Sequence, residues 1–231
     1  MTKAEVRQLQ QELLEQGFYS GKVDGIWGPL SQAAIEAATA TLALCQGVEC
    51  PTSVPTGGPR LAWGAKVSST FRDRVRWIAN DLRMPSDGPD WLMACMAWES
   101  AETFSPSVTN MAGSGATGLI QFMPRTAEGL GTSTEQLARM TAEDQLNYVY
   151  KHFRPFRGRL NSLSDVYMAI LWPAAVGKPE NHVLWNRDAR PTTYRQNAGL
   201  DVNRDGSITK AEAASKVAEK LAKGRRPELL G

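Results

Sequence analysis

Hydrophobic residues recur at helical spacing through most of the 231-residue chain. In the first segment the apolar positions fall three or four residues apart, at Val6, Leu9, Leu13 and Leu14. This spacing predicts an amphipathic helix with one buried face. Thr2 and Glu5 have the separation of a capping box at its start, and Gly17 provides its end. A second, alanine-rich helix is expected from about residue 29 to residue 44.

Downstream of about residue 67 the pattern is again helical almost throughout. The segments with this pattern are 71–83, 89–100, 123–131, 141–156 and 164–175. None of them shows the sustained alternation of a half-buried strand. We therefore expect a mainly α fold, with at most a short hairpin near the glycine-rich stretch at 113–118.

A segment rich in proline and glycine, residues 50–64, interrupts the helical pattern. Such composition is typical of a linker. The sequence thus predicts a small helical bundle at 1–48, a linker at 49–64 and a larger, mainly α-helical domain at 65–231.

Composition excludes several classes of protein. The net charge of +2 is too small to indicate a protein that binds nucleic acid, and no apolar stretch is long enough to span a membrane. The first residues form a polar amphipathic pattern without the apolar core of a secretory signal, so a cytoplasmic start is expected. Nothing in the pattern indicates more than a monomer.

The chain has three cysteines, an odd number that argues against a disulfide framework. Cys45 and Cys50 could close a short ring in an oxidising compartment or remain free thiols, and Cys95 is expected to be a small buried residue. Neither His152 nor His182 stands at zinc-ligand spacing. The sequence therefore predicts no zinc site.

Glu99 is the strongest candidate for chemistry. Helical spacing places it on the same side as Leu92, Cys95 and Met96, so the carboxylate continues an apolar stripe. Burial raises the pKa of a carboxyl group and keeps it protonated near neutrality, as a general acid requires. The alternative is a glutamate at a frayed helix end that reaches into solvent.

The residues after Glu99 resemble the catalytic signature of the lysozyme-like lytic transglycosylase superfamily. The matching positions are Glu99, Ser100, Phe104, Pro106, Gly118, Leu119, Gln121 and Pro124. The resemblance implies that Glu99 is the catalytic acid. It also places Ser100, Gly118 and Gln121 beside a glycan in the cleft, where Gln121 offers hydrogen bonds and glycine lets the backbone pass close to the sugar.

Most glycosidases need a second carboxylate, and the only other acid between Glu99 and Gln121 is Glu102. If Glu102 is solvated, Glu99 is the only catalytic acid. A single acid favours lytic transglycosylation of the bond between N-acetylmuramic acid and N-acetylglucosamine, as the resemblance also implies. Hydrolysis by a muramidase that uses Glu102, or a carboxylate from farther along the chain, is the alternative. A non-catalytic wall-binding protein is a further one.

The resemblance weakens toward the C-terminus. Family members often end a helix in Ala-Tyr-Asn-Ala-Gly, but residues 169–179 read AILWPAAVGKP, so the role of that asparagine is not transferred. Tyr148 and Tyr150 are candidate sugar-stacking residues or core residues, and Trp172 and Trp185 carry the same ambiguity.

The N-terminal segment 6–37 resembles a three-helix peptidoglycan-binding domain, with the turn Asp24–Gly28 and Ser31 as its recognisable part. Trp27 is expected to pack into the small core, leaving binding to the surrounding groove. The alternative is that its ring presents a face to glycan or stem peptide.

Residues 201–212, DVNRDGSITKAE, reproduce the calcium-binding loop of an EF-hand. The expected ligands are Asp201, Asn203, Asp205, the carbonyl of Ser207 and a bidentate Glu212, with Thr209 near a bridging water. The alternative is an acidic turn before a helix. We expect a structural Ca²⁺ that pins the C-terminal helix, and no cofactor for catalysis.

Together the two resemblances imply a modular phage endolysin that acts on the peptidoglycan of Gram-negative hosts. Such an enzyme would wait in the host cytoplasm and reach the wall in the periplasm through a holin-type release partner. Stable membrane insertion and binding to nucleic acid are not expected.

Overall fold

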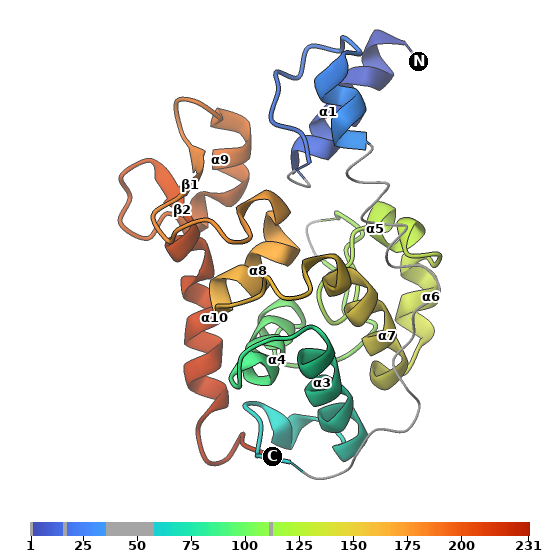
Figure 1. Ribbon diagram of the computed structural model, residues 1–231, viewed down its shortest axis with the longest axis vertical. Helices are drawn as coiled ribbons and strands as arrows, with labels where there is room; N and C mark the ends of the chain where they lie inside the picture. The colour runs from blue at the N-terminus through green and yellow to red at the C-terminus, as the bar shows by residue number, and fades with distance from the viewer. Residues whose placement is uncertain (1, 16–17, 36–57, 111–112) are drawn as a thin grey trace.

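The computed structural model describes residues 2–15, 18–35, 58–110 and 113–231. These residues are mainly helical, as predicted (Figure 1). Cys45, Cys50, Gly17 and the expected second helix beyond residue 35 lie outside the described residues. No helix within those ranges is both long and apolar enough to cross a membrane.

The N-terminal module begins with α1, Lys3–Glu15. Its predicted capping box forms, since the amide of Thr2 donates to Glu5 Oε2 at 2.6 Å. Residues 29–35 are also helical, and Leu13, Tyr19 and Ala34 make a small core. These few contacts form a core separate from that of the larger domain.

Gln10 occupies the interior of this module. Its side chain is buried, its Nε2 donates to the carbonyl of Ile26 at 2.9 Å and to Ser31 Oγ at 3.0 Å, and its Oε1 accepts from Gly25 N at 2.8 Å. Gly25 has φ of 75°, a conformation that favours glycine. The amide side chain of Gln10 therefore holds the turn at residues 24–28 through hydrogen bonds to its backbone.

The larger domain contains eight α-helices among the described residues, several 3₁₀ turns and one small sheet. The α-helices are α3 Ser69–Asp81, α4 Gly88–Glu99, α5 Pro124–Gly129, α6 Thr134–Arg139, α7 Ala142–Phe153, α8 Leu163–Leu171, α9 Pro191–Asn197 and α10 Lys210–Gly224. The 3₁₀ turns are η1 Gly64–Lys66, η2 Arg154–Phe156, η3 Pro173–Ala175 and η4 Ala198–Leu200. The strands are β1 Val183–Asn186 and β2 Ser207–Thr209.

Helix α4 is the central element. Every residue from 92 to 97 is buried, including Cys95, as expected for a helix that is apolar on all sides. Helices α3, α8 and α10 pack around it (Figure 1). Glu99 is the C-terminal residue of α4 and lies at the edge of this core.

The larger domain starts earlier than the sequence pattern predicts. Leu61, Ala62 and Trp63 are buried in the main core, and the indole Nε1 of Trp63 donates to the carbonyl of Lys220 at 2.9 Å. The amide of Leu61 also donates to the C-terminal Gly231 at 2.7 Å. The predicted linker end at residue 64 is therefore wrong, because proline and glycine mark irregular backbone and do not report burial.

The only sheet in the described ranges is antiparallel and pairs β1 with β2, with Asn186 opposite Ser207. The hairpin expected near the glycine-rich stretch is reduced to isolated bridges, in which Thr117 pairs with Thr109 and with Phe122. Helices α6 and α9 are short and were not predicted, since six or seven residues are too few to show helical periodicity.

Candidate active site

Glu99 ends α4 with its side chain only partly exposed. Burial raises the pKa of its carboxyl group from the ordinary 4.5 to about 8. Among the described groups, none donates a hydrogen bond or offers a cation to this carboxylate, and desolvation alone accounts for the shift. A carboxyl group with this pKa is protonated at neutral pH and able to give up its proton during a reaction.

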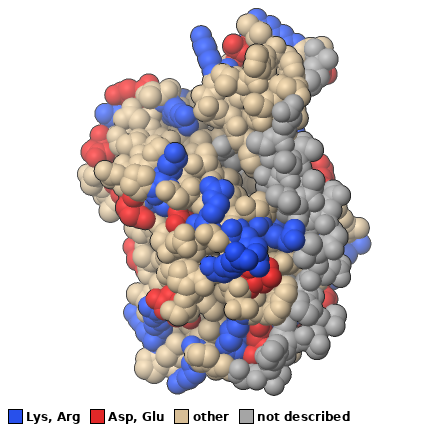
Figure 2. Space-filling model, in the orientation of Figure 1, with Lys and Arg blue, Asp and Glu red and all other residues tan. Residues whose placement is uncertain are grey.

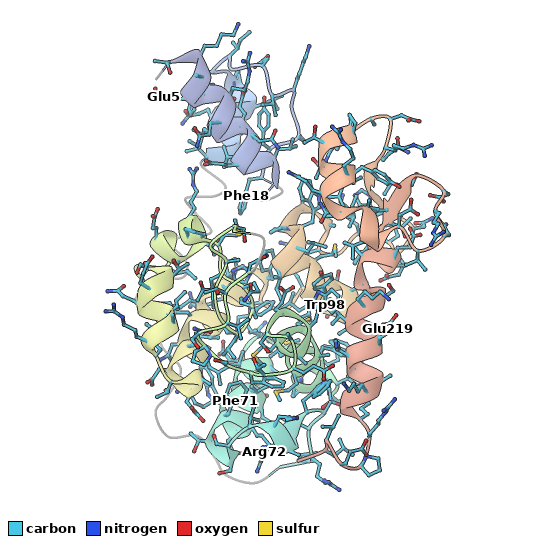
Figure 3. All side chains as sticks on the ribbon, turned by 180° about the vertical axis from the view of Figure 1, so that it is seen from behind. Glu5, Phe18, Phe71, Arg72, Trp98 and Glu219 are labelled. Atoms are coloured by element: carbon cyan, nitrogen blue, oxygen red, sulfur yellow. The ribbon has the colours of Figure 1, made fainter. Side chains whose placement is uncertain are left out.

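Tyr167 of α8 is a site residue that sequence reasoning missed. Its side chain is buried, and its hydroxyl accepts a hydrogen bond of 3.2 Å from Nε1 of Trp98, the neighbour of Glu99 (Figure 3 labels Trp98). Burial and then the Glu99 charge raise the pKa of Tyr167, which places its hydroxyl near that carboxylate. The only sequence signal is one phenol within the otherwise apolar stretch from Val166 to Leu171 of α8.

Ser100 has a structural role in place of the predicted contact with the glycan. It is fully buried, its Oγ donates to the carbonyl of Met96 at 2.6 Å, and the amide of Phe104 donates to it at 3.0 Å. The residues that follow turn sharply, with positive φ at Ala101 and Glu102. Strained backbone of this kind persists where surrounding contacts hold it, and Ser100 is one of these contacts.

Glu102, the possible second carboxylate, is held by two lysines of α10. Its Oε1 accepts from Lys220 Nζ at 2.5 Å and its Oε2 accepts from Lys223 Nζ at 2.6 Å. These two hydrogen bonds, with that from Lys220 the larger effect, lower the pKa of Glu102. Its carboxylate stays ionised and both of its oxygens bind α10, so Glu99 is left without an acidic partner three residues away.

Gly118 lies against protein and not against the expected glycan. It is buried with φ of 87°, and a Cβ there would lie 2.3 Å from Gln145 Oε1. Gln145, fully buried on α7, accepts from Leu119 N at 2.6 Å and donates to Pro106 O at 3.0 Å and Leu137 O at 2.9 Å. The glycine therefore makes room for an amide that holds the loop, and Gln145 is a second residue that sequence reasoning missed.

Gln121 also uses its amide within the loop. Its Nε2 donates to the carbonyls of Val108 and Gly118, each at 3.1 Å, and its backbone has φ of 52°. The side chain is partly exposed. Its contact with a glycan stays a prediction.

The aromatic candidates divide into core and surface. Tyr150 is buried and donates to Asp81 Oδ2 at 2.8 Å, which agrees with the core role given as its alternative. Trp172 and Trp185 are buried against each other at 5.5 Å between ring centroids. Tyr148 is partly exposed and remains a candidate for sugar contact.

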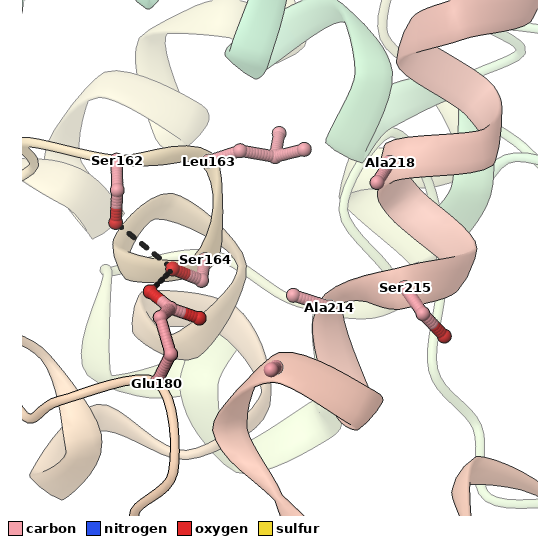
Figure 4. A pocket seen from close by; sticks show the side chains of 8 residues that line it. Ser162, Leu163, Ser164, Glu180, Ala214, Ser215 and Ala218 are labelled. Carbon is pink, nitrogen blue, oxygen red and sulfur yellow. Dashed lines mark hydrogen bonds between the residues drawn. The ribbon is translucent and has the colours of Figure 1, made fainter. Parts of the chain in front are cut away.

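A groove on another part of the domain lies between the start of α8 and α10 (Figure 4). Ser162, Ser164 and Glu180 form its polar side, and Ser164 Oγ donates to Glu180 Oε1 at 2.5 Å. Neither Glu99 nor the glycine-rich loop lines it. It is therefore separate from the candidate active site.

Trp27 of the N-terminal module is exposed, contrary to the prediction of a core residue. Its exposed fraction is 38%, and those of Ile26 and Leu30 are 62% and 61%. Gln10 fills the interior where an indole was expected. Three large apolar side chains close together in the sequence thus face solvent.

The acidic loop at 201–212 connects η4 to α10 and includes β2. In the described part of the chain, no three histidine, cysteine, aspartate or glutamate side chains are already grouped as a metal cluster. Asp201 is buried, whereas Asn203 and Asp205 are exposed and bond each other at 3.0 Å. The ligands expected from the sequence therefore stay a prediction.

The fold and site define a protein with a small bundle that exposes apolar side chains and a helical domain that ends its central helix in a protonated acid. Comparison with protein families assigns each part. Residues 2–38 match the peptidoglycan binding domain family, and residues 77–168 match the transglycosylase SLT domain family. The comparison with curated proteins gave no match. The chain is a modular protein that joins a peptidoglycan-binding domain to a lytic transglycosylase domain, and it is an enzyme that cleaves glycosidic bonds of peptidoglycan.

Proposed function

We propose that this protein is a phage endolysin that cleaves the β-1,4 bond between N-acetylmuramic acid and N-acetylglucosamine by lytic transglycosylation. The observation that carries the proposal is the desolvated carboxyl group of Glu99 at the end of α4. Burial raises the pKa of Glu99 to about 8, while Glu102 is bound by two lysines and kept ionised. One carboxyl group suits a reaction in which the substrate supplies its own nucleophile.

In this mechanism the Glu99 carboxyl group gives its proton to the glycosidic oxygen, and the bond from that oxygen to C1 of N-acetylmuramic acid breaks. The positive charge at C1 is relieved when the 6-hydroxyl oxygen of the same sugar bonds to C1. Glu99, now a carboxylate, takes the proton of that hydroxyl. The products are a free 4-hydroxyl on N-acetylglucosamine and a 1,6-anhydro end, no water is consumed, and the acid is regenerated.

The N-terminal module would hold the enzyme on its polymeric substrate. Exposed Ile26, Trp27 and Leu30 offer an apolar surface of the kind that stacks on sugars and stem peptides. On the larger domain, Lys and Arg side chains gather over the segment that joins α7 to α8 (Figure 2). This segment carries Arg157 and Arg159, both exposed. A positive face would favour approach to an anionic cell wall.

Host lysis is the biological role that this combination supports best. The enzyme would be stored in the host cytoplasm, released to the periplasm by a holin-type partner and then degrade the wall as a monomer. Co-expression with a membrane-permeabilising protein tests this role. Rapid loss of culture turbidity only when both proteins are present is expected, and unchanged turbidity would count against it.

The catalytic assignment is tested by the clearing of permeabilised Gram-negative cells. Glu99→Gln removes the transferable proton and is expected to lower the clearing rate by about 100-fold or more. Glu102→Gln, three residues away, is the matched control and should clear within about threefold of the wild type once folded protein is quantified. Equal loss in both variants would support a muramidase that uses two acids. Equal clearing by Glu99→Gln and wild type would remove Glu99 from the reaction.

A further inference from the structure

A buried carboxylate oxygen in the 201–212 loop has no partner. Asp201 is 7% exposed, and its Oδ2 accepts from Gly206 N at 3.0 Å and from Tyr194 Oη at 2.6 Å. Its Oδ1 is shielded from solvent and receives no hydrogen bond from any described group. Such an atom is costly, because a carboxylate removed from water needs a donor or a cation. The bond to Gly206 crosses the loop, so this carboxylate faces its interior.

The rest of the loop supplies further oxygen donors, although its three carboxylates are not gathered into one cluster. The carboxylate of Glu212 reaches back over the start of the loop, where Asn203 N lies 3.4 Å from its Oε1. Asp205 and Asn203 are joined to each other through their side chains at 3.0 Å. Three carboxylates within 12 residues repel one another unless a cation separates them. Oxygen atoms of carboxylates, amides and carbonyls are the ligands that calcium prefers.

The backbone has the features that such a loop requires. Gly206 has φ of 86°, which supplies the sharp turn at the sixth position. Ile208, at the eighth, is fully buried and pairs with Trp185 of β1. Ser207, at the seventh, stands where the backbone carbonyl is a ligand in loops of this type. The loop is therefore anchored to the domain through β2 and Ile208.

We propose that residues 201–212 bind one structural calcium ion through Asp201, Asn203, Asp205, the Ser207 carbonyl and Glu212. Two of these ligands, Asn203 and the Ser207 carbonyl, are not carboxylates, so the acidic side chains are only part of the ligand set. At present Asp205 Oδ1 accepts from Ser207 N at 2.8 Å and Glu212 Oε2 accepts from Thr209 Oγ1 at 2.7 Å. The ion draws Asp205 and Glu212 toward Asp201 Oδ1 and satisfies that oxygen.

The ion also stabilises the position of α10 relative to the active site. This helix starts two residues before Glu212, and its buried first residue, Lys210, pairs with Asp165 of α8 at 2.6 Å. Farther along, Lys220 binds Glu102 beyond the end of α4. Helix α8 also carries Tyr167, so both helices braced by α10 contribute to the surroundings of Glu99. Loss of calcium thus loosens the framework of the site without removing a reacting group.

The experiment uses the full chain after removal of divalent ions with a chelator. Calcium binding is measured by titration calorimetry, and thermal unfolding is followed with and without calcium. One bound ion per chain is expected, with a rise in the melting midpoint of about 5–10 °C at a hundredfold excess over Kd. Terbium should bind at the same place and give luminescence sensitised by nearby aromatic residues, Trp185 and Tyr194 among them.

Glu212→Gln separates the role of Glu212 as a calcium ligand from its role in capping α10. Glutamine serves the capping box with Thr209 as well as glutamate does, so α10 should still start at residue 210. The variant is expected to lose calcium affinity by tenfold or more and most of the calcium-dependent rise in midpoint. Glu219→Gln removes the same charge from an exposed position of α10 and is expected to behave as the wild type.

Two results would overturn the proposal. One is the absence of binding heat and of any midpoint change up to millimolar calcium. The other is calcium binding that Glu212→Gln and Glu219→Gln leave equally unchanged. Because both readouts are independent of catalysis, the calcium site stands or falls separately from the proposed reaction.

Discussion

The indole Nε1 of Trp98 donates to the hydroxyl of Tyr167 across 3.2 Å, joining the last turn of α4 to α8. Both side chains come from helices of the main core, and Tyr167 is buried. Glu99 follows Trp98 directly, so this bond fixes the part of α4 that carries the acid. Catalytic groups need such support, because small displacements of the acid are costly in rate.

Replacing Tyr167 with phenylalanine removes this acceptor and leaves the Trp98 Nε1 without its partner. The expected loss of stability is about 1 kcal/mol, since one hydrogen bond to a partly buried donor is lost. We also expect wall cleavage to slow by roughly 3- to 10-fold because Glu99 is less well positioned. Denaturant unfolding and cleavage rates on purified sacculi measure both effects. Tyr150→Phe, which removes the hydrogen bond from another buried tyrosine to Asp81, is the matched control, and an equal loss of cleavage rate there would contradict a specific role for Tyr167.

The raised pKa of Glu99 makes stability depend on pH. Between pH 4.5 and 8 the folded chain keeps a proton that the unfolded chain releases, so stability falls as pH rises through this interval. Glu99→Gln removes the free-energy cost of burying this ionisable group. The variant should be more stable than the wild type by about 1–3 kcal/mol at pH 8. At pH 4 the two should be equal. A constant difference from pH 4 to pH 8 would show that Glu99 has an ordinary pKa.

For activity the same pKa has a complementary consequence. The acid is protonated below about pH 8 and ionised above it, so cleavage should decline as pH rises through this value. Initial rates on purified sacculi at constant ionic strength test this decline. A rate that instead falls near pH 4.5 would contradict the shifted pKa.

Gly118 and Gln145 should behave as a coupled pair. Gly118→Ala introduces a Cβ that meets Gln145 Oε1 in a backbone conformation unfavourable to alanine, with an expected cost of about 2–4 kcal/mol. Gln145→Ala leaves the amide of Leu119 and two carbonyls without partners, at a similar cost. The double variant should lose at least 1 kcal/mol less than the sum, because the clash is gone. Strict additivity in urea unfolding would mean that the two side chains do not meet.

Trp27 should contribute to binding of the wall and not to folding of the catalytic domain. Trp27→Ala is expected to weaken co-sedimentation with purified sacculi by about 10-fold, as loss of an exposed aromatic contact typically does. Gln8→Ala changes an exposed residue of α1 and serves as the control. Equal retention of Trp27→Ala and wild type on sacculi would place the binding surface elsewhere on the module.

Features with local causes could be predicted from the sequence. The expected C-terminal helix is α10, which starts directly after Thr209 because Thr209 and Glu212 cap it and an uninterrupted helical pattern follows. The buried character of α4 and the partial burial of Glu99 follow from an apolar stripe within one helix. Each of these signals lies within a few turns of the chain.

Partners distant in sequence could not be predicted in this way. Gln145 is 26 residues from Leu119, Tyr167 is 69 from Trp98, and Lys220 is 118 from Glu102. Helical periodicity reports which face is buried but not which helix covers it. The same gap explains the error at Trp27, because the sequence does not reveal that Gln10 occupies the interior beneath that turn.

Mass spectrometry of peptidoglycan digested in ¹⁸O-labelled water tests most directly whether Glu99 acts alone. A reaction completed by the 6-hydroxyl of the sugar predicts fragments ending in 1,6-anhydro-muramic acid, one water lighter than the hydrolysed form and free of the label. Fragments ending in reducing muramic acid that carry one ¹⁸O atom would show that water is the nucleophile, which would contradict the single-acid mechanism.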